Sequence, residues 1–110
     1  NWTLMANICE NKFHIYCESK SVLEKIVEKL DTLFETTLDG EISYASDSTI
    51  EGYFDSRWAF PVEVFNDFFR EFNDDSIYMR CLSEEYGCGL VSMNIYVDGQ
   101  WKEPQCFDLY

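Results

Sequence analysis

Apolar and polar residues alternate along four stretches of the chain, with the period of two that is typical of half-buried β-strands. The stretches are NKFHIYCES (residues 11–19), EISYASDSTIEGYFDSRW (41–58), SIYMRCLSEE (76–85) and LVSMNIYV (90–97). The second stretch is long enough for two strands joined around Asp47-Ser48. The alternation therefore predicts five strands.

Two other segments repeat their apolar residues at helical spacing. The first is SVLEKIVEKLDTLF (21–34), where Ser21 and Glu24 have the spacing of a capping box. We expect Asp39-Gly40 to form the turn that ends this unit. The second is PVEVFNDFFREF (61–72), in which four phenylalanines share one face behind a proline that suits a first helical position. Such a stripe of phenylalanines indicates a buried core.

The predicted order along the chain is β-α-β-β-α-β-β, in a single domain that covers residues 1–110. Two helices over one face of a mostly antiparallel sheet belong to the α+β class, and we expect a ferredoxin-like sandwich. Asp98-Gly99 favours a hairpin turn, after which residues 100–110 return as a short edge segment whose pairing Pro104 limits. Residues 1–4 are interpreted as an added or trimmed start.

The composition of the chain fits one soluble domain. The chain has 110 residues, of which 46% are hydrophobic and 17% aromatic. It contains no apolar run near the roughly 20 residues that a membrane-spanning helix needs. Its first residues lack the basic start and apolar centre of a signal peptide. These features predict a cytoplasmic protein.

Charge is the most unusual property of the sequence. Twenty-one acidic residues against eight basic ones give a net charge of −13. Four acids and four bases occur up to Leu30, and seventeen acids face only four bases from Asp31 onward. A surface of this kind repels phosphates, so the charge argues against direct binding of DNA, RNA or anionic membranes.

The sequence shows no established pattern of catalytic residues. Five cysteines are scattered without a C-x-x-C pair, and we expect most of them to be buried apolar residues. Cys88 lies between Gly87 and Gly89, where a tight turn is a better interpretation than a reactive thiol, because Glu84 and Glu85 would raise its pKa. No phosphate-binding loop or nucleophile elbow is present. We predict no catalytic residue, cofactor or metal site.

Three segments of the chain resemble a known family. MANICENKFHI (5–15), FDSRWAFP (54–61) and SEEYGCGLVS (83–92) are similar, in this order, to segments of the YubB-type ferredoxin-like domains of plasmids and phages. The resemblance implies a ferredoxin-like fold and an origin in a mobile element or a bacterial cytosol. It implies no catalytic residues.

The residues of these motifs suit folding better than chemistry. Asn7 and Asn11 are expected to bond turn backbone at the ends of the first strand, and Trp58 and Phe60 to anchor the second helix on the sheet. Gly87 and Gly89 are expected to shape the hairpin.

The first functional hypothesis is a non-enzymatic interaction protein whose acidic surface binds a basic, nucleic-acid-handling partner. Its sharpest form is an antagonist that imitates the charge of nucleic acid to block a host defence or DNA-handling protein. The candidate contacts are the row Glu63, Asp67, Glu71, Asp74 and Asp75, together with the acids from Asp31 to Asp55, among them Asp39, Glu41, Asp47 and Glu51. A homodimer is compatible with the open sheet face. The alternative is that the acidity only keeps the protein soluble.

The second hypothesis is a small-molecule-binding domain or small enzyme with a cleft beside the Gly87–Gly89 hairpin. Its candidate lining residues are Glu85, Tyr86, Cys88 and Trp101. An RNA-binding sheet is disfavoured by the net charge.

Overall fold

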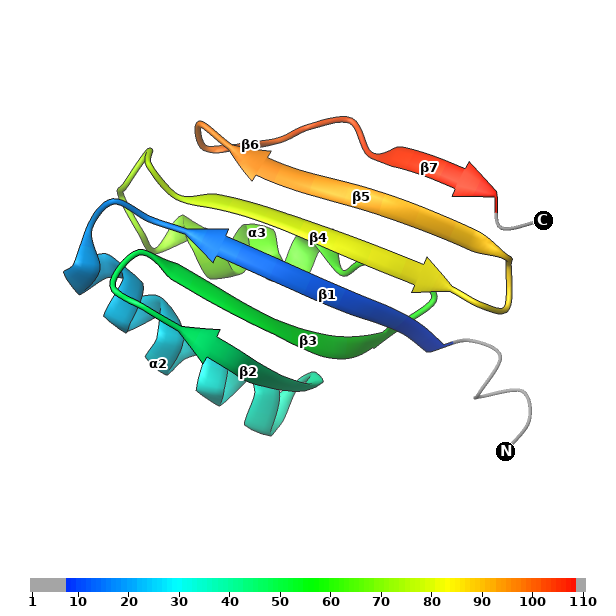
Figure 1. Cartoon of the computed structure of the whole chain (residues 1–110), viewed down its shortest axis with the longest axis horizontal. Helices are drawn as coiled ribbons and strands as arrows, with labels where there is room; N and C mark the ends of the chain where they lie inside the picture. The colour runs from blue at the N-terminus through cyan, green and yellow to red at the C-terminus, as the bar shows by residue number, and fades with distance from the viewer. Residues whose placement is uncertain (1–7, 109–110) are drawn as a thin grey trace.

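The structure, a computed structural model, describes residues 8–108, and the elements are labelled in Figure 1. The strands are β1 (Ile8–Tyr16), β2 (Asp39–Ala45), β3 (Thr49–Arg57), β4 (Tyr78–Glu85), β5 (Leu90–Val97), β6 (Gln100–Trp101) and β7 (Gln105–Asp108). The helices are α2 (Lys20–Thr36) and α3 (Val62–Arg70). The start proposed for residues 1–4 and the role proposed for Asn7 lie outside the described residues.

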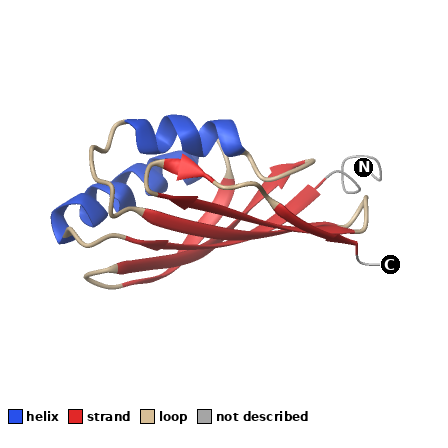
Figure 2. Cartoon of the chain, turned by 90° about the horizontal axis from the view of Figure 1, so that it is seen from above, coloured by secondary structure: helices blue, strands red, loops and turns tan. Residues whose placement is uncertain are grey.

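The described strands form one seven-stranded sheet in which every pairing is antiparallel. The strand order is β2-β3-β1-β4-β5-β6, and β7 also pairs with β5. Both helices pack on the same face of this sheet, as Figure 2 shows. None of the helices in the described part of the chain is long and apolar enough to cross a membrane.

The prediction of a ferredoxin-like sandwich with the order β-α-β-β-α-β-β is wrong, although the α+β class is correct. The sheet contains seven strands instead of five, and its spatial order does not follow the chain. The two additional strands, β6 and β7, come from the segment that we expected to form one short edge. Pro104 lies between them, where it has no N–H group to donate to β5, so the returning chain pairs in two pieces.

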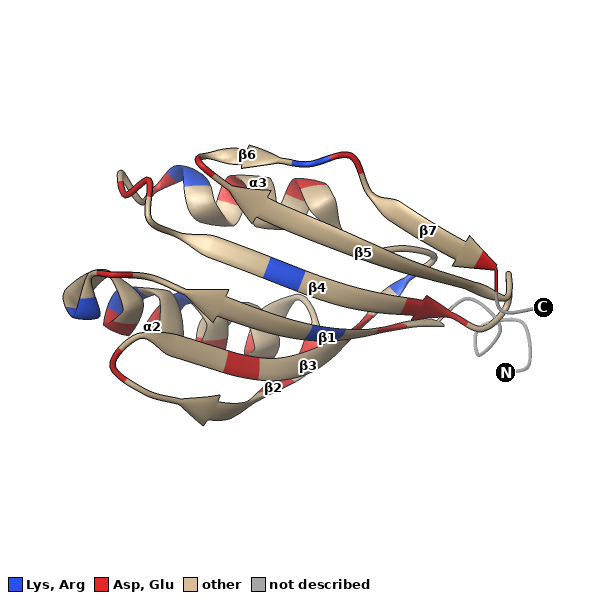
Figure 3. Ribbon diagram, turned by 45° about the horizontal axis from the view of Figure 1, so that its top comes forward, with Lys and Arg blue, Asp and Glu red and all other residues tan. Residues whose placement is uncertain are grey.

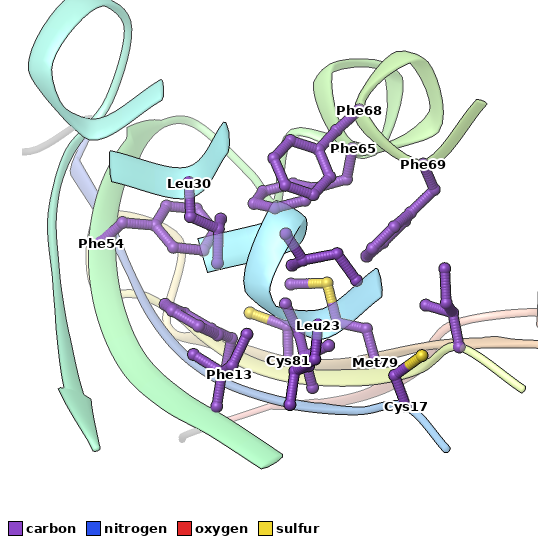
Figure 4. Packing of buried hydrophobic residues seen from close by; sticks show 14 of the residues in the cluster. Phe13, Cys17, Leu23, Leu30, Phe54, Phe65, Phe68, Phe69, Met79 and Cys81 are labelled. Carbon is purple, nitrogen blue, oxygen red and sulfur yellow. The ribbon is translucent and has the colours of Figure 1, made fainter. Parts of the chain in front are cut away.

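The core lies between the sheet and the two helices (Figure 4). Alternate residues of β1, β3 and β4 point into it, which confirms the period-two pattern of the sequence. The buried members are Phe13, Ile15, Cys17, Leu23, Ile26, Leu30, Ile50, Phe54, Phe60, Phe65, Phe68, Phe69, Ile77, Met79 and Cys81. Three of the five cysteines, Cys9, Cys17 and Cys81, are buried as expected.

The two helices begin close to their predicted positions. α2 begins at Lys20, because its N-cap is Ser19, two residues before the predicted cap Ser21, and Ser19 accepts a hydrogen bond from the Val22 N–H at 3.3 Å. In α3, Phe65, Phe68 and Phe69 are buried, which confirms the predicted apolar stripe. Phe69 also stacks on Tyr96 of β5 at 4.7 Å between ring centroids, so α3 covers the β5 side of the sheet.

Two glycines leave room for aromatic side chains that pack closely against the sheet. A Cβ atom on Gly52 would lie 2.7 Å from the Phe13 ring and 2.3 Å from the Glu41 carbonyl oxygen. A Cβ atom on Gly40 would lie 2.5 Å from Phe54 Cβ. Gly40 is therefore needed for packing, and the turn predicted at Asp39-Gly40 is wrong because both residues belong to β2.

The predicted hairpin turns are confirmed. Asp98 and Gly99 both have positive φ angles, 53° and 75°, as a tight two-residue turn requires. Gly89 ends the β4–β5 turn with φ of 64°, and Cys88 is exposed within that turn. Phe60 is buried against Phe65, as expected. Trp58 is 61% exposed, so it does not have the expected role of anchoring the second helix on the sheet.

Candidate functional site

The face of the sheet opposite the helices is not covered by any helix within residues 8–108 (Figure 2). We call it the open face. The side chains on it come from the positions that alternate with the buried ones, such as Glu10 and Lys12 on β1. Because the strands are in a fixed antiparallel register, these side chains line up in rows that cross the strands.

One such row consists of carboxylates on four adjacent strands. Asp39 of β2 is opposite Asp55 of β3, Asp55 is opposite Glu10 of β1, and Glu10 is opposite Glu84 of β4. We call these four residues the carboxylate row. Since neighbouring strands are about 4.8 Å apart, the row is about 14 Å long. Figure 3 shows acidic positions at the C-terminal end of β4, where the arrowhead is drawn.

The carboxylate row has little local compensation for its charge. None of the salt bridges found among the described residues involves any of its four members. The pKa of Asp55 is raised, first by partial burial and then by the negative charges of Glu10 and Asp39. Like charges directly opposite in a sheet are destabilising. The ionised form of Asp55 is therefore in an unfavourable environment, which a basic side chain from a partner would improve.

Tyr86 provides one neutral donor to this row. Its hydroxyl lies 2.7 Å from Glu84 Oε2 and 3.1 Å from Glu10 Oε2, so the two carboxylates share one proton donor. These hydrogen bonds raise the pKa of Tyr86. Tyr86 thus holds two like charges close together without neutralising them.

A second row, formed by Glu41, Tyr53, Lys12 and Leu82, lies beside the first. Tyr53 donates a hydrogen bond to Glu41 Oε2 at 2.5 Å, which raises the pKa of Tyr53. A hollow of about 400 Å³ is lined by both rows, with Asp39, Glu41 and Asp55 supplying carboxylates and Lys12 a single ammonium group. A lysine or arginine side chain from a partner suits this hollow by its charge.

Beyond the carboxylate row, the open face has an apolar part centred on β5, which Arg80 of β4 borders opposite Ile95. The side chains Leu82, Val91, Met93, Ile95, Val97 and Phe107 lie on β4, β5 and β7. We call these six residues the apolar strip. None of them belongs to the core cluster or packs against it. On β5 it is the polar residues Ser92 and Asn94 that are buried on the helix side, so the apolar row of this strand faces outward.

The acids predicted on the second helix lie on the opposite side of the molecule from the open face. Asp67 forms a salt bridge with Arg70 at 3.1 Å, and Glu71 forms one with Lys29 at 3.1 Å. Glu63 lies in the first turn of α3, where a negative charge is favourable. This helical row is therefore partly neutralised within the protein.

The remaining predicted acids are divided between the two faces. Asp74 follows α3 and accepts hydrogen bonds from the Ser76 hydroxyl at 2.7 Å and the Ser76 N–H at 2.8 Å, which lower its pKa. Asp75 is exposed next to it. Asp47, in the β2–β3 turn, forms a salt bridge at 3.6 Å with Lys20 at the start of α2. Glu51 is on the open face, 3.2 Å from His14.

The four residues of the predicted cleft are not brought together. Glu85, Tyr86 and Cys88 lie around the β4–β5 turn, but Trp101 pairs with Tyr96 near the other end of β5, about 20 Å along the strand. Glu85 also points to the helix side, opposite Cys9, where burial raises its pKa. Trp101 packs among Phe60, Phe69 and Tyr96.

The buried thiols are poorly suited to nucleophilic chemistry. Burial is the main cause that raises the pKa of Cys9 to about 11 and that of Cys81 to about 12. Both thiols therefore remain protonated at neutral pH. Among residues 8–108, no three His, Cys, Asp or Glu side chains form a group that could hold a metal ion.

Two members of the carboxylate row, Glu10 and Glu84, were missed as contact residues from the sequence, whereas Asp39 and Asp55 belong to the predicted acidic segment. The alternation of Glu10 and Glu84 with buried neighbours places each on the outer side of its own strand. Only the strand order β2-β3-β1-β4 and its register place them in one row with Asp39 and Asp55. Comparison of the chain with protein-family models, curated proteins and solved structures gave no match, so the open face is interpreted from its own residues.

Proposed function

We propose that this protein is a non-enzymatic, acidic interaction domain, and that its open face binds a basic protein at a surface that otherwise contacts nucleic acid. The observation that supports this proposal is the carboxylate row, in which four negative charges cross four adjacent strands. The rigid sheet fixes these charges in place, so a partner need not order them on binding.

The spacing of the row is comparable to that of a nucleic-acid backbone. Neighbouring carboxylates are separated by about one strand spacing of 4.8 Å. One strand of B-DNA carries a charge about every 3.4 Å along the helix axis. The net charge of −13 extends this field over the whole surface and steers a basic partner toward it.

The resemblance to plasmid and phage domains supports a specific version of this proposal. In that version the protein comes from a mobile element, acts in the bacterial cytoplasm and occupies the DNA- or RNA-binding surface of a host protein. Binding then depends strongly on salt and competes directly with nucleic acid, because both ligands use the same Lys and Arg side chains.

The test is capture of bacterial lysate proteins on the immobilised domain as the salt concentration is raised, with duplex DNA as competitor. The test variant carries Glu10→Gln, Asp39→Asn, Asp55→Asn and Glu84→Gln. The matched control removes four charges from the helix layer instead, through Glu24→Gln, Glu28→Gln, Glu63→Gln and Asp67→Asn. Both variants have the same net charge, so a difference between them reports the position of the charge and not its amount.

We expect the domain to retain a basic, nucleic-acid-handling protein that salt and DNA release. We also expect the carboxylate-row variant to lose it while the helix-layer variant keeps it. Equal loss in both variants would mean that only the total charge matters. Loss in the helix-layer variant alone would move the binding surface to the helix layer formed by α2 and α3. Retention by both variants would refute an electrostatic interface.

A further inference from the structure

Along the carboxylate row, the open face changes from acidic to apolar between β4 and β5. The carboxylate row ends at Glu84, and the next residues along the same row are Val91 of β5 and Phe107 of β7. In the neighbouring row, Leu82 is followed by Met93. An anionic half and an apolar half therefore share one continuous surface.

The apolar strip has no partner within the described chain. Phe107 is 60% exposed, and the other five side chains are partly exposed. Three strands, β4, β5 and β7, contribute side chains to the strip. Contiguous apolar surface on a soluble protein marks an interaction site more often than scattered exposed residues do.

We infer that the partner segment is bipartite: one half carries Lys and Arg for the carboxylate row, and the other half carries apolar side chains for the strip. This inference rests on the proposed function, and it names the chemistry of the partner. Charge complementarity fixes the orientation, because the basic half lies over β2, β3 and β1 and the apolar half over β5 and β7. Electrostatic attraction increases the association rate and sets the orientation of the segment on the sheet. Burial of apolar surface on the strip accounts for most of the slow dissociation rate.

A second copy of the chain fits this surface less well. The open face carries more acids than bases, so a second copy brings like charge to the carboxylate row. The acids are Glu10, Asp39, Glu41, Glu51, Asp55 and Glu84, and the bases are Lys12, Arg57 and Arg80.

The dimensions of the open face set the length of the segment. Five strand spacings separate β2 from β7, which is about 24 Å. A helix that crosses the strands over this distance has about 16 residues, at 1.5 Å per residue.

The probe for this inference is a labelled peptide of about 16 residues with Lys in one half and Leu in the other. The control peptide has the same composition, but its Lys and Leu are distributed evenly along the length. Fluorescence anisotropy gives the Kd of both peptides for three forms of the domain: the original chain, the carboxylate-row variant, and a strip variant with Val91→Thr, Met93→Gln and Ile95→Thr. The threonines keep the β-propensity of β5, and circular dichroism checks that each form is folded.

We expect the segregated peptide to bind at least about tenfold more tightly than the mixed one, a difference that the strip variant abolishes. The carboxylate-row variant is expected to weaken both peptides. Equal binding of the two peptides, or no effect of the strip variant, would overturn the bipartite partner while leaving the acidic interface intact. No effect of the carboxylate-row variant would overturn the proposed function itself. If analytical ultracentrifugation shows a dimer that the strip variant dissociates, a second copy occupies the strip and the inference is wrong.

Discussion

The two faces of the sheet are built from the same strands but differ in their side chains and in their exposure to water. On the helix-covered face, apolar side chains and a hydrogen-bonded network around Asn11 exclude water. On the open face, four carboxylates oppose one another without a salt bridge among the described residues. The change occurs between adjacent residues, since Phe54 is fully buried and Tyr53 is 49% exposed. One face therefore carries the stability of the fold, and the other is free to carry an unfavourable charge pattern.

A buried polar network on the covered face makes this contrast clearer. The Asn11 amide nitrogen is within hydrogen-bond distance of the Phe54 carbonyl at 3.1 Å and of Ser56 Oγ at 3.0 Å. Its amide oxygen accepts from Ser83 Oγ at 2.6 Å. Every polar atom of Asn11 has a partner, as a buried side chain requires. The carboxylate row, in contact with water, tolerates groups whose interactions are unfavourable.

The largest expected change in the free energy of unfolding compares two neighbouring residues that point to opposite faces of the sheet, Phe54 and Tyr53. Phe54→Ala removes a ring that contacts Phe13, Phe34 and Phe65, and we expect it to lower the free energy of unfolding by about 3–5 kcal/mol. Tyr53→Ala removes a half-exposed ring on the open face, and we expect it to cost less than about 1 kcal/mol. Urea denaturation measures both. Similar losses at the two positions would break the comparison between the faces.

The next effect concerns the buried network. Asn11→Ala leaves the Ser83 hydroxyl and the Phe54 carbonyl without their partner, and we expect a loss of about 1–3 kcal/mol. Asn94→Ala on the same face is the matched control, because Asn94 is also buried but makes only a 3.4 Å contact with Ser92. We expect a smaller loss there, measured by the same denaturation. A larger loss at Asn94 would show that the network does not stabilise the fold in this way.

The sequence pattern predicted single elements well but not their assembly. The LVSMNIYV strand begins and ends where predicted, and the Phe65, Phe68 and Phe69 stripe is buried. These features depend on local spacing, which a sequence displays directly. The division of residues 100–108 into β6 and β7 depends instead on whether β5 offers free hydrogen-bonding groups on its outer edge, a property of the assembled sheet.

The candidate site was only partly predictable for the same reason. Asn11 was expected at the end of a strand, but it lies buried within β1, where cross-strand partners satisfy it. Asp39 and Asp55 belong to the predicted acidic segment, but only the register of β1, β2 and β3 places them in one row with Glu10. The sequence also did not show that the apolar row of β5 faces away from the helices. Alternation shows that the two faces of a strand differ, but not which face the helices cover.

The smallest expected effect on stability tests the electrostatics of the carboxylate row. Because the pKa of folded Asp55 is raised, its ionised form is less favourable in the folded state than in the unfolded state. Asp55→Asn should therefore stabilise the protein at pH 7, by less than about 1 kcal/mol. The gain should shrink as the pH falls toward about 4 and below, where Asp55 itself becomes protonated. Thermal unfolding of both forms across this pH range measures the trend.

Asp74 supplies the control with the opposite sign. Hydrogen bonds from Ser76 lower the pKa of Asp74, so its ionised form stabilises the folded state above the ordinary pKa of aspartate, and this stabilisation is lost as the pH falls. Asp74→Asn should therefore destabilise the protein at pH 7 and have little effect at low pH. Opposite signs at pH 7 with convergence in acid would show that the local environment of Asp55, which combines partial burial with the charges of Glu10 and Asp39, and not the total charge, sets its response. If both substitutions stabilise the protein equally, the net charge of −13 dominates and the row has no special strain to relieve.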